Sequence, residues 1–225
     1  MEDDDIHESP LTLPALGEHT ATVIIAHGLG DNGRTWMNLV TEWSWCDLFP
    51  HIKFIFPNAP SLPVTVCSGA CIPAWFDIRS YNDLYGGNHD KSGIGTSRDY
   101  LNRLIENEID NNIPSSRIIV GGFSQGGAAA LFTGLASTHK LAGFFGLSSY
   151  LPMLPEVEDI IGSTALPRLL AHAFSPAEIA DLGEFIEARL PSVQIPNRIR
   201  DELNEMRCQA VPTAASKLLA MRDPV

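Results

Sequence analysis

Short apolar runs rich in β-branched residues alternate along this chain with segments whose apolar residues recur at helical spacing. Runs of the first kind are typical of strands that are buried on both faces. They occupy residues 22–27, 53–56, 117–121, 141–148 and 166–171. The helical period is found at 97–109 and at 176–189. This alternation predicts an α/β fold, with a mostly parallel sheet and helices on both faces.

The helix expected at 176–189 has clear signals at both ends. Ser175, Pro176 and Glu178 form a capping box with proline at the first helical position, and Pro191 ends the helix. Its predicted apolar face consists of Ile179, Leu182, Phe185 and Ile186. The chain therefore carries a well-defined amphipathic helix near its C-terminal part.

Two long loops are expected, at 58–75 and 80–94. Loops at the carboxyl ends of strands carry the ligand site in this class of fold. Residues 192–225 combine mixed charge with weak helical periodicity and offer no partner strand. We therefore expect a domain at 1–191 and a loosely attached tail at 192–225.

The strand at 117–121 runs directly into the sequence Gly122-Phe123-Ser124-Gln125-Gly126, and the helix-forming segment 128–132 follows. A Gly-x-Ser-x-Gly sequence at a strand-to-helix junction is typical of the nucleophile elbow of serine hydrolases. The two glycines remove the Cβ atoms that would clash in so sharp a turn. The pattern predicts Ser124 as a nucleophile at the tip of that turn.

A second glycine-containing turn, His27-Gly28-Leu29-Gly30-Asp31, follows the first strong strand. Its glycines allow the backbone to turn back over the sheet, so that an N–H can point toward the elbow. We expect the backbone N–H groups of Leu29 and Gln125 to converge as an oxyanion hole, which acyl transfer requires. His27 is expected to hold the loop and not to transfer protons.

Composition excludes several classes of partner. The chain has 225 residues, of which 44% are hydrophobic and 19% charged, as in an ordinary globular protein. Its net charge of −12 argues against nucleic acid or an anionic membrane held by bulk electrostatics. The first residues lack the basic and apolar regions of a secretory signal, and no apolar run reaches the length of a membrane span. We expect a cytoplasmic protein, with the nucleus as the alternative compartment.

The cysteines do not indicate a metal site. The chain contains Cys46, Cys67, Cys71 and Cys208, and their spacing does not match the paired pattern of zinc sites. We expect all four to be reduced thiols, in keeping with a cytosolic protein. No cofactor and no metal are predicted.

Six segments, in order, resemble the acyl-protein thioesterase group of the phospholipase/carboxylesterase family, whose members are α/β-hydrolases. The segments are 27–31, 56–60, 63–65, 74–78, 121–127 and 146–152. The resemblance implies a serine hydrolase that cleaves long-chain acyl thioesters, such as S-palmitoyl cysteine, from proteins through an acyl-Ser124 intermediate. It also implies lysophospholipids and carboxylic esters as substrates, with membrane contact only through acylated substrates.

The same resemblance implies which residues serve the reaction. Ser124 is the nucleophile, and the backbones of Leu29 and Gln125 supply the oxyanion donors. The acyl channel would involve the loop that contains Pro63 and Trp75, although an ordinary core position is the alternative for Trp75.

The catalytic partners of Ser124 depart from the family pattern. The family order is Ser, then Asp, then His, and the histidines after Ser124 are His139 and His172. His139 lies in the connection after the elbow helix, where a surface role is expected, so His172 is the candidate base. The acid is unassigned, with Asp159 and Asp181 as the downstream alternatives.

The sequence around His172 resembles two family segments at once. The residues before it resemble the strand that leads to the catalytic acid, and the residues after it resemble those that follow the catalytic histidine. We therefore expect a domain truncated near residue 172 that lacks one C-terminal helix–strand unit. The alternative function is a catalytically silent shortened isoform, or a gene-model product, that at most binds acyl chains.

Overall fold

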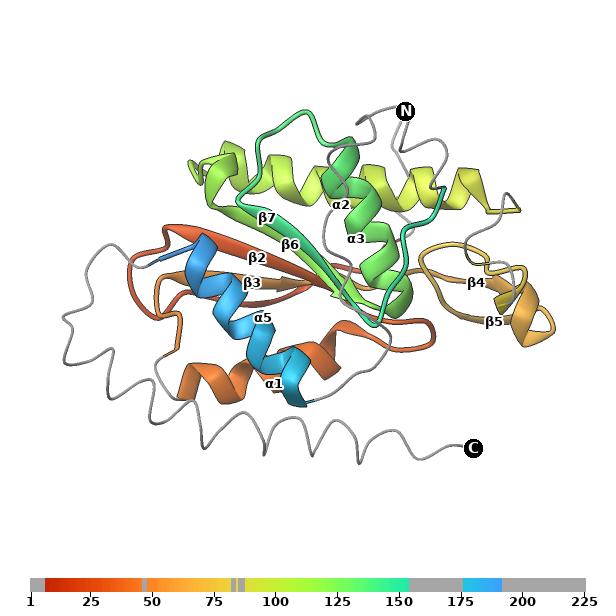
Figure 1. Cartoon of the computed structure of the whole chain (residues 1–225), viewed down its shortest axis with the longest axis horizontal. Helices are drawn as coiled ribbons and strands as arrows, with labels where there is room; N and C mark the ends of the chain where they lie inside the picture. Colours follow the sequence, from red (N-terminus) through yellow and green to blue (C-terminus); the bar gives the residue numbers. More distant parts are fainter. Residues whose placement is uncertain (1–6, 46–47, 82–83, 85–87, 154–175, 192–225) are drawn as a thin grey trace.

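A five-stranded sheet forms the centre of the molecule, in the order β1-β3-β2-β6-β7 (Figure 1). Its strands are β1 (Leu11–Leu13), β2 (Ala21–Ala26), β3 (Ile52–Phe56), β6 (Ile118–Phe123) and β7 (Gly143–Leu147). β2 pairs in parallel with β3 and β6, and β6 pairs in parallel with β7, whereas β1 runs antiparallel to β3 at one edge. The mostly parallel sheet predicted from the sequence is therefore confirmed. The computed structural model describes residues 7–45, 48–81, 84, 88–153 and 176–191.

Helices cover both faces of this sheet, as predicted (Figure 1). α2 (Lys91–Asp110) and α3 (Ser124–Ala136) pack on one face, and α1 (Gly33–Trp45) and α5 (Pro176–Arg189) pack on the other. Each face has its own apolar core, because the strands are buried on both sides: every residue of β2 is buried. Among the described helices, none is both long and apolar enough to cross a bilayer.

The sequence analysis missed helix α1 and three strands. β1 is a short edge strand, and the loop expected at 58–75 contains a hairpin of β4 (Ser61–Val64) and β5 (Ala70–Pro73) joined through the 3₁₀ turn η1 (Thr65–Cys67). Four-residue strands are too short to show a convincing period. Cys67 and Cys71 on this hairpin are free cysteines.

The helix expected at 97–109 begins earlier, at Lys91, within the predicted loop 80–94. Asp90 is its N-cap, and its carboxylate accepts a hydrogen bond from the Gly93 N–H at 3.0 Å. Because Gly93 and Gly95 have low helix propensity, the sequence pattern did not indicate a helix at this first turn. The capping aspartate therefore outweighs local propensity here.

The helix predicted at 176–189 is confirmed as α5. Leu182 and Ile186 on it are buried, and Phe185 makes an edge-to-face contact with Phe145 of β7. The end of α5 is held at the amino edge of the sheet, where the His51 Nε2–H donates to the Leu190 carbonyl at 2.9 Å. The expected strand at 166–171 and the tail at 192–225 lie outside the described residues, as does the expected truncation near residue 172.

A buried carboxylate joins α2 to the amino ends of β2 and β3. The Glu108 side chain is fully buried and receives the Lys53 ammonium at 2.6 Å and the Thr22 hydroxyl at 2.7 Å. His19 Nε2 lies 2.9 Å from the Thr22 hydroxyl and 3.6 Å from Glu108. We call these four side chains the Glu108 cluster. It lies at the end of the sheet opposite to the elbow, because Thr22 and Lys53 are near the starts of their strands.

Candidate active site

The turn at Ser124 has the backbone geometry of a nucleophile elbow. β6 ends at Phe123, and α3 begins at the next residue, so no loop separates strand from helix. Ser124 has φ of 50°, in the left-handed region that a residue with a Cβ avoids. Such a conformation costs on the order of 1–3 kcal/mol and is found where the surrounding structure enforces it. Ser124 therefore lies in a strained conformation at the sharp turn that the sequence predicted, and its side chain is half-buried.

The elbow glycines allow α3 to touch the end of β2. A Cβ at Gly126 would lie 2.2 Å from the His27 carbonyl oxygen, and a Cβ at Gly122 would lie 2.5 Å from that of Ala26. Both contacts are with backbone atoms, which cannot move aside as a flexible side chain can. The sequence analysis expected these glycines to avoid a clash within the turn, and the structure shows that they also permit the close approach of α3 to β2.

This approach places the turn after β2 beside the elbow. A Cβ built on Gly28 would lie 3.6 Å from the Ser124 Cβ. Leu29, the next residue, packs against the core on the α3 side of the sheet. The hydroxyl of Ser149, just beyond β7, donates to the Ser124 carbonyl at 2.7 Å. Segments from β2, β6 and β7 therefore meet around Ser124 at the carboxyl edge of the sheet.

His27 is fully buried, and both of its ring nitrogens are engaged by the backbone. Nε2 accepts a hydrogen bond from the Ala59 N–H at 3.0 Å, so the proton resides on Nδ1, which donates to the Gly28 carbonyl at 2.7 Å. Burial lowers the pKa of His27, which keeps the ring neutral. These contacts hold the loop, as the sequence analysis expected of this residue.

The side chains of Gln125 and Trp75 tie the elbow to the segment after β5. Gln125 is fully buried; its amide oxygen accepts from the Trp75 N–H at 3.0 Å, and its amide nitrogen donates to the Phe76 carbonyl at 2.6 Å. The Trp75 indole N–H donates to the His27 carbonyl at 2.7 Å. Since Trp75 is 2% exposed and lies within the core, its environment favours the core alternative over an acyl-channel lining, whereas Pro63 is exposed on β4.

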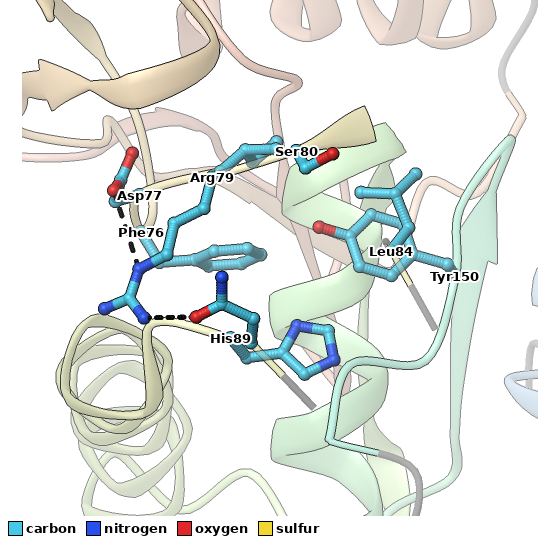
Figure 2. A pocket seen from close by; sticks show the side chains of 9 residues that line it. Phe76, Asp77, Arg79, Ser80, Leu84, His89 and Tyr150 are labelled. Carbon is cyan, nitrogen blue, oxygen red and sulfur yellow. Dashed lines mark hydrogen bonds and ion pairs between the residues drawn. The ribbon is translucent and has the colours of Figure 1, made fainter. Parts of the chain in front are cut away.

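A small pocket opens beside Tyr150, close to the residues that follow β7 (Figure 2). Its lining consists of Phe76, Asp77, Ile78, Arg79, Ser80, Leu84, Asn88, His89 and Tyr150. The Arg79 guanidinium donates to the Asn88 side chain at 2.8 Å and lies 4.0 Å from the Asp77 carboxylate. In Figure 2, Leu84 and Tyr150 face Phe76 and His89 across the pocket. The pocket lining thus combines apolar side chains, such as Phe76 and Leu84, with polar and charged ones, such as His89 and the paired Arg79.

The structure separates the predicted site residues into two groups. Ser124, Leu29 and Gln125 all lie at the elbow and the turn beside it. The candidate base His172 and the alternative acid Asp159 lie outside the described residues. Asp181 is exposed on α5, and His139 is exposed after α3, in agreement with the surface role expected for it. Among the described residues, no histidine hydrogen-bonds to Ser124.

Sequence reasoning missed the side-chain contacts that support the elbow. The hydrogen bonds of Gln125 with Trp75, of the His27 ring with the Ala59 N–H and of Ser149 with the Ser124 carbonyl join residues far apart in the chain. No local sequence pattern predicts them. The available signal for Gln125 was its position directly after the serine, at the start of a helix whose first turn lies against the end of β2. Its complete burial shows that this polar side chain has an internal partner.

One buried and two half-buried imidazoles make stability depend on pH. Burial lowers the pKa of His19, His27 and His51 from the ordinary value of 6.5. The three rings therefore bind protons more readily in the unfolded chain than in the folded one. Their contribution to the free energy of unfolding is complete above that ordinary pKa value and is lost as the pH falls below it. We expect the urea midpoint to decrease between about pH 7.5 and about pH 5.5 at constant ionic strength. An unchanged midpoint over this range would contradict the expectation, and His27→Gln should reduce the dependence.

Comparisons with known proteins agree with this geometry. Residues 8–203 match the family described as Phospholipase/Carboxylesterase. The chain is 45% identical to acyl-protein thioesterase 1 of Emericella nidulans over 173 residues, which cover 73% of this chain and 72% of that protein. It is 48% identical to acyl-protein thioesterase 1 of Neurospora crassa over 170 residues, which cover 72% of this chain and 69% of that protein.

The fold is also found in solved structures. The crystal structure of Zea mays acyl-protein thioesterase 2 superposes with a TM-score of 0.66 at 24% identity, and the match covers 80% of this chain and 98% of that one. Sequence identity to the curated relatives and similarity of fold to the solved structure thus point to the same group of hydrolases. The strand-to-helix serine turn and the mostly parallel sheet described above agree with both. This chain belongs to the phospholipase/carboxylesterase family and has the α/β-hydrolase fold.

Proposed function

We propose that this chain is a serine hydrolase that cleaves long-chain acyl thioesters from cysteines of proteins, with Ser124 as the nucleophile. The observation that carries the proposal is the left-handed φ of 50° at Ser124, at the junction of β6 and α3, in a chain 45% identical to an acyl-protein thioesterase 1. S-acylated proteins are the proposed substrates, with lysophospholipids and small carboxylic esters as further ones. The cytoplasm is the proposed compartment.

The proposed reaction is an acyl transfer in two steps. The Ser124 hydroxyl oxygen bonds to the thioester carbonyl carbon while its proton passes to a base, and the carbonyl oxygen becomes an oxyanion. The backbone N–H groups of Leu29 and Gln125 stabilise that charge. The C–S bond then breaks, the cysteine sulfur leaves as a thiol after taking up the proton, and an acyl-Ser124 ester remains. Water attacks this ester, which releases the fatty acid and restores the hydroxyl.

Two features of the described chain support the proposed oxyanion donors. Gln125 is in the first turn of α3, where backbone N–H groups have no carbonyl partner within the helix. Gly28, which precedes Leu29, approaches the Ser124 side chain. A carbonyl bound at Ser124 would thus be close to N–H groups from both segments, where its developing charge needs them.

The base is proposed to be His172. The second candidate function is a catalytically silent chain that binds acylated ligands. It is favoured by the sequence around His172, which resembles at once the family segment before the catalytic acid and the segment after the catalytic histidine. His27, the nearest along the motif, has both ring nitrogens engaged by backbone groups. A serine without its base retains the rate that the oxyanion hole and binding supply, about a thousandfold over water.

A fluorophosphonate probe and an S-palmitoyl peptide distinguish these two functions. We expect the probe to label the chain and Ser124→Ala to abolish that labelling, while Ser92→Ala, at an exposed serine of α2, leaves it unchanged. With His172 as base and no acid, turnover should be about four orders of magnitude below that of a complete triad. Labelling no stronger than in Ser124→Ala would support the silent alternative. Turnover at ordinary enzyme rates that is lost in His172→Ala would mean that a carboxylate such as Asp181 or Asp159 completes the triad.

A further inference from the structure

The peptide between Gly28 and Leu29 is held from one side by the His27 ring. The Nδ1–H of His27 donates to the Gly28 carbonyl at 2.7 Å, and the Asp31 N–H donates to the same oxygen at 3.2 Å. A trans peptide is planar, so its C=O and its N–H point in opposite directions. The N–H that belongs to this peptide is that of Leu29. A constraint on the Gly28 carbonyl therefore sets the direction of the Leu29 N–H.

The ring that applies this constraint can exist in one protonation state. The Ala59 N–H is a donor and occupies Nε2 at 3.0 Å, which requires a lone pair on that nitrogen. The single proton of the neutral ring is therefore on Nδ1, where the Gly28 carbonyl needs a donor. Protonation of Nε2 would place two donors against each other in a site that excludes water, since His27 is fully buried.

The peptide before Gly28 is held as well. The His27 carbonyl accepts from the Trp75 indole N–H at 2.7 Å, and α3 lies so near that a Cβ at Gly126 would be 2.2 Å away from this oxygen. The imidazole and the indole are also in contact, with ring centroids 5.2 Å apart. Both peptides that flank Gly28 thus have their carbonyls held by buried side chains, although glycine itself would leave the turn free to rotate.

We propose that His27 is a positioning residue of the hydrolase, which aims the Leu29 N–H at the oxyanion through its Nδ1–H bond to the Gly28 carbonyl, in a tautomer set by Ala59. The inference rests on the proposed function, because Leu29 is an oxyanion donor only if Ser124 is the nucleophile. His27 acts through the backbone and exchanges no proton with the substrate. If His27 only stabilised the fold, its two hydrogen bonds would affect reactivity equally. In the proposed role, the bond to the Gly28 carbonyl affects the reactivity of Ser124 more than the bond to Ala59 does, and this difference can be tested.

Two conservative variants separate the two ring nitrogens. Asparagine at position 27 places its amide nitrogen near the position of Nδ1 and can still donate to the Gly28 carbonyl, but it cannot reach Ala59. Glutamine places its amide oxygen near the position of Nε2 and can still accept from the Ala59 N–H, but it loses the bond to Gly28. Each variant gives up one buried hydrogen bond, so both should unfold at similar urea concentrations.

The measurement is the second-order rate at which a fluorophosphonate labels Ser124, since that reaction also develops charge on an oxygen in the oxyanion hole. We expect His27→Gln to label about a hundredfold more slowly than the wild type, as for loss of an oxyanion donor. His27→Asn should label within about tenfold of the wild type, because it keeps the donor that fixes the peptide plane. His139→Asn, at an exposed histidine, is the control and should leave the rate unchanged.

A second measurement reads the tautomer without any reaction. In ¹⁵N-histidine-labelled wild-type protein, ring ¹H–¹⁵N correlations of His27 at about pH 7.5 should show a neutral ring with its proton on Nδ1. A proton on Nε2 would overturn the proposal. Equal labelling rates for His27→Asn and His27→Gln, with a labelled wild type, would overturn it too. A wild type that labels no faster than Ser124→Ala would instead refute the proposed function, and the positioning role with it.

Discussion

Replacement of Gly126 by alanine is expected to lower the free energy of unfolding by about 3 kcal/mol, toward the upper end of overpacking costs. The added Cβ would lie 2.2 Å from the His27 carbonyl oxygen and 2.5 Å from that of Ala26, and both are backbone atoms at the end of a buried strand. The first turn of α3 and the end of β2 must therefore separate. Since these two segments carry the proposed oxyanion donors, labelling of Ser124 by a fluorophosphonate should fall by about a hundredfold or more.

Gly95 is the matched control for this substitution. It is also a helical glycine, on α2, and a Cβ there would meet no atom within 4 Å. Gly95→Ala should stabilise the protein by about 0.5–1 kcal/mol, because alanine loses less conformational freedom in a helix. Urea unfolding followed by circular dichroism measures both variants. Equal and small effects of the two substitutions would show that α3 does not approach β2 as closely as described.

Loss of the Glu108 carboxylate should produce a second large effect. We expect Glu108→Ala to lower the free energy of unfolding by about 3 kcal/mol, at the lower end of the cost of breaking a buried pair. The substitution leaves the Lys53 ammonium, 2.6 Å from the carboxylate in the native protein, without its partner, and it leaves the Thr22 hydroxyl without an acceptor. The lower end of the range applies because the Lys53 side chain is 25% exposed and water can solvate it in part.

The neighbouring Glu106 tests whether this cost comes from burial. It is exposed on the same helix, so Glu106→Ala should change the free energy of unfolding by less than about 0.5 kcal/mol. Lys53→Met in the Glu108→Ala background should recover part of the loss, because it removes the stranded charge and keeps an apolar stem. A Glu108→Ala protein as stable as Glu106→Ala would contradict the role given to the Glu108 cluster. Because this cluster lies at the opposite end of the sheet from Ser124, the labelling rate of the folded variant should stay at the wild-type value.

Local sequence was sufficient for the elements whose cause is local. The β-branched run before Gly122 forms a buried strand because each of its side chains is apolar, and Ser124 adopts a strained turn where two glycines allow it. The helix at 176–189 was predicted with its correct bounds, because its proline start and apolar spacing lie within the segment itself. The edge strand β1 and the β4–β5 hairpin were missed, because three or four residues carry too little pattern to identify them.

The sequence by itself thus determined the fold class, the serine turn and the position of the glycine turn after β2. Tertiary structure alone decided what holds that site: Ala59 reaches His27 across 32 residues of chain, and Gln125 reaches Trp75 across 50. It likewise brought Thr22 to Glu108 across 86 residues. The type of a side chain indicates whether it will be buried. The hydrogen-bond partner of a buried polar side chain depends instead on which group the packing of the sheet and helices places within hydrogen-bond distance. The tautomer of His27 belongs to this second kind of fact, because it follows from the placement of the Ala59 N–H beside Nε2.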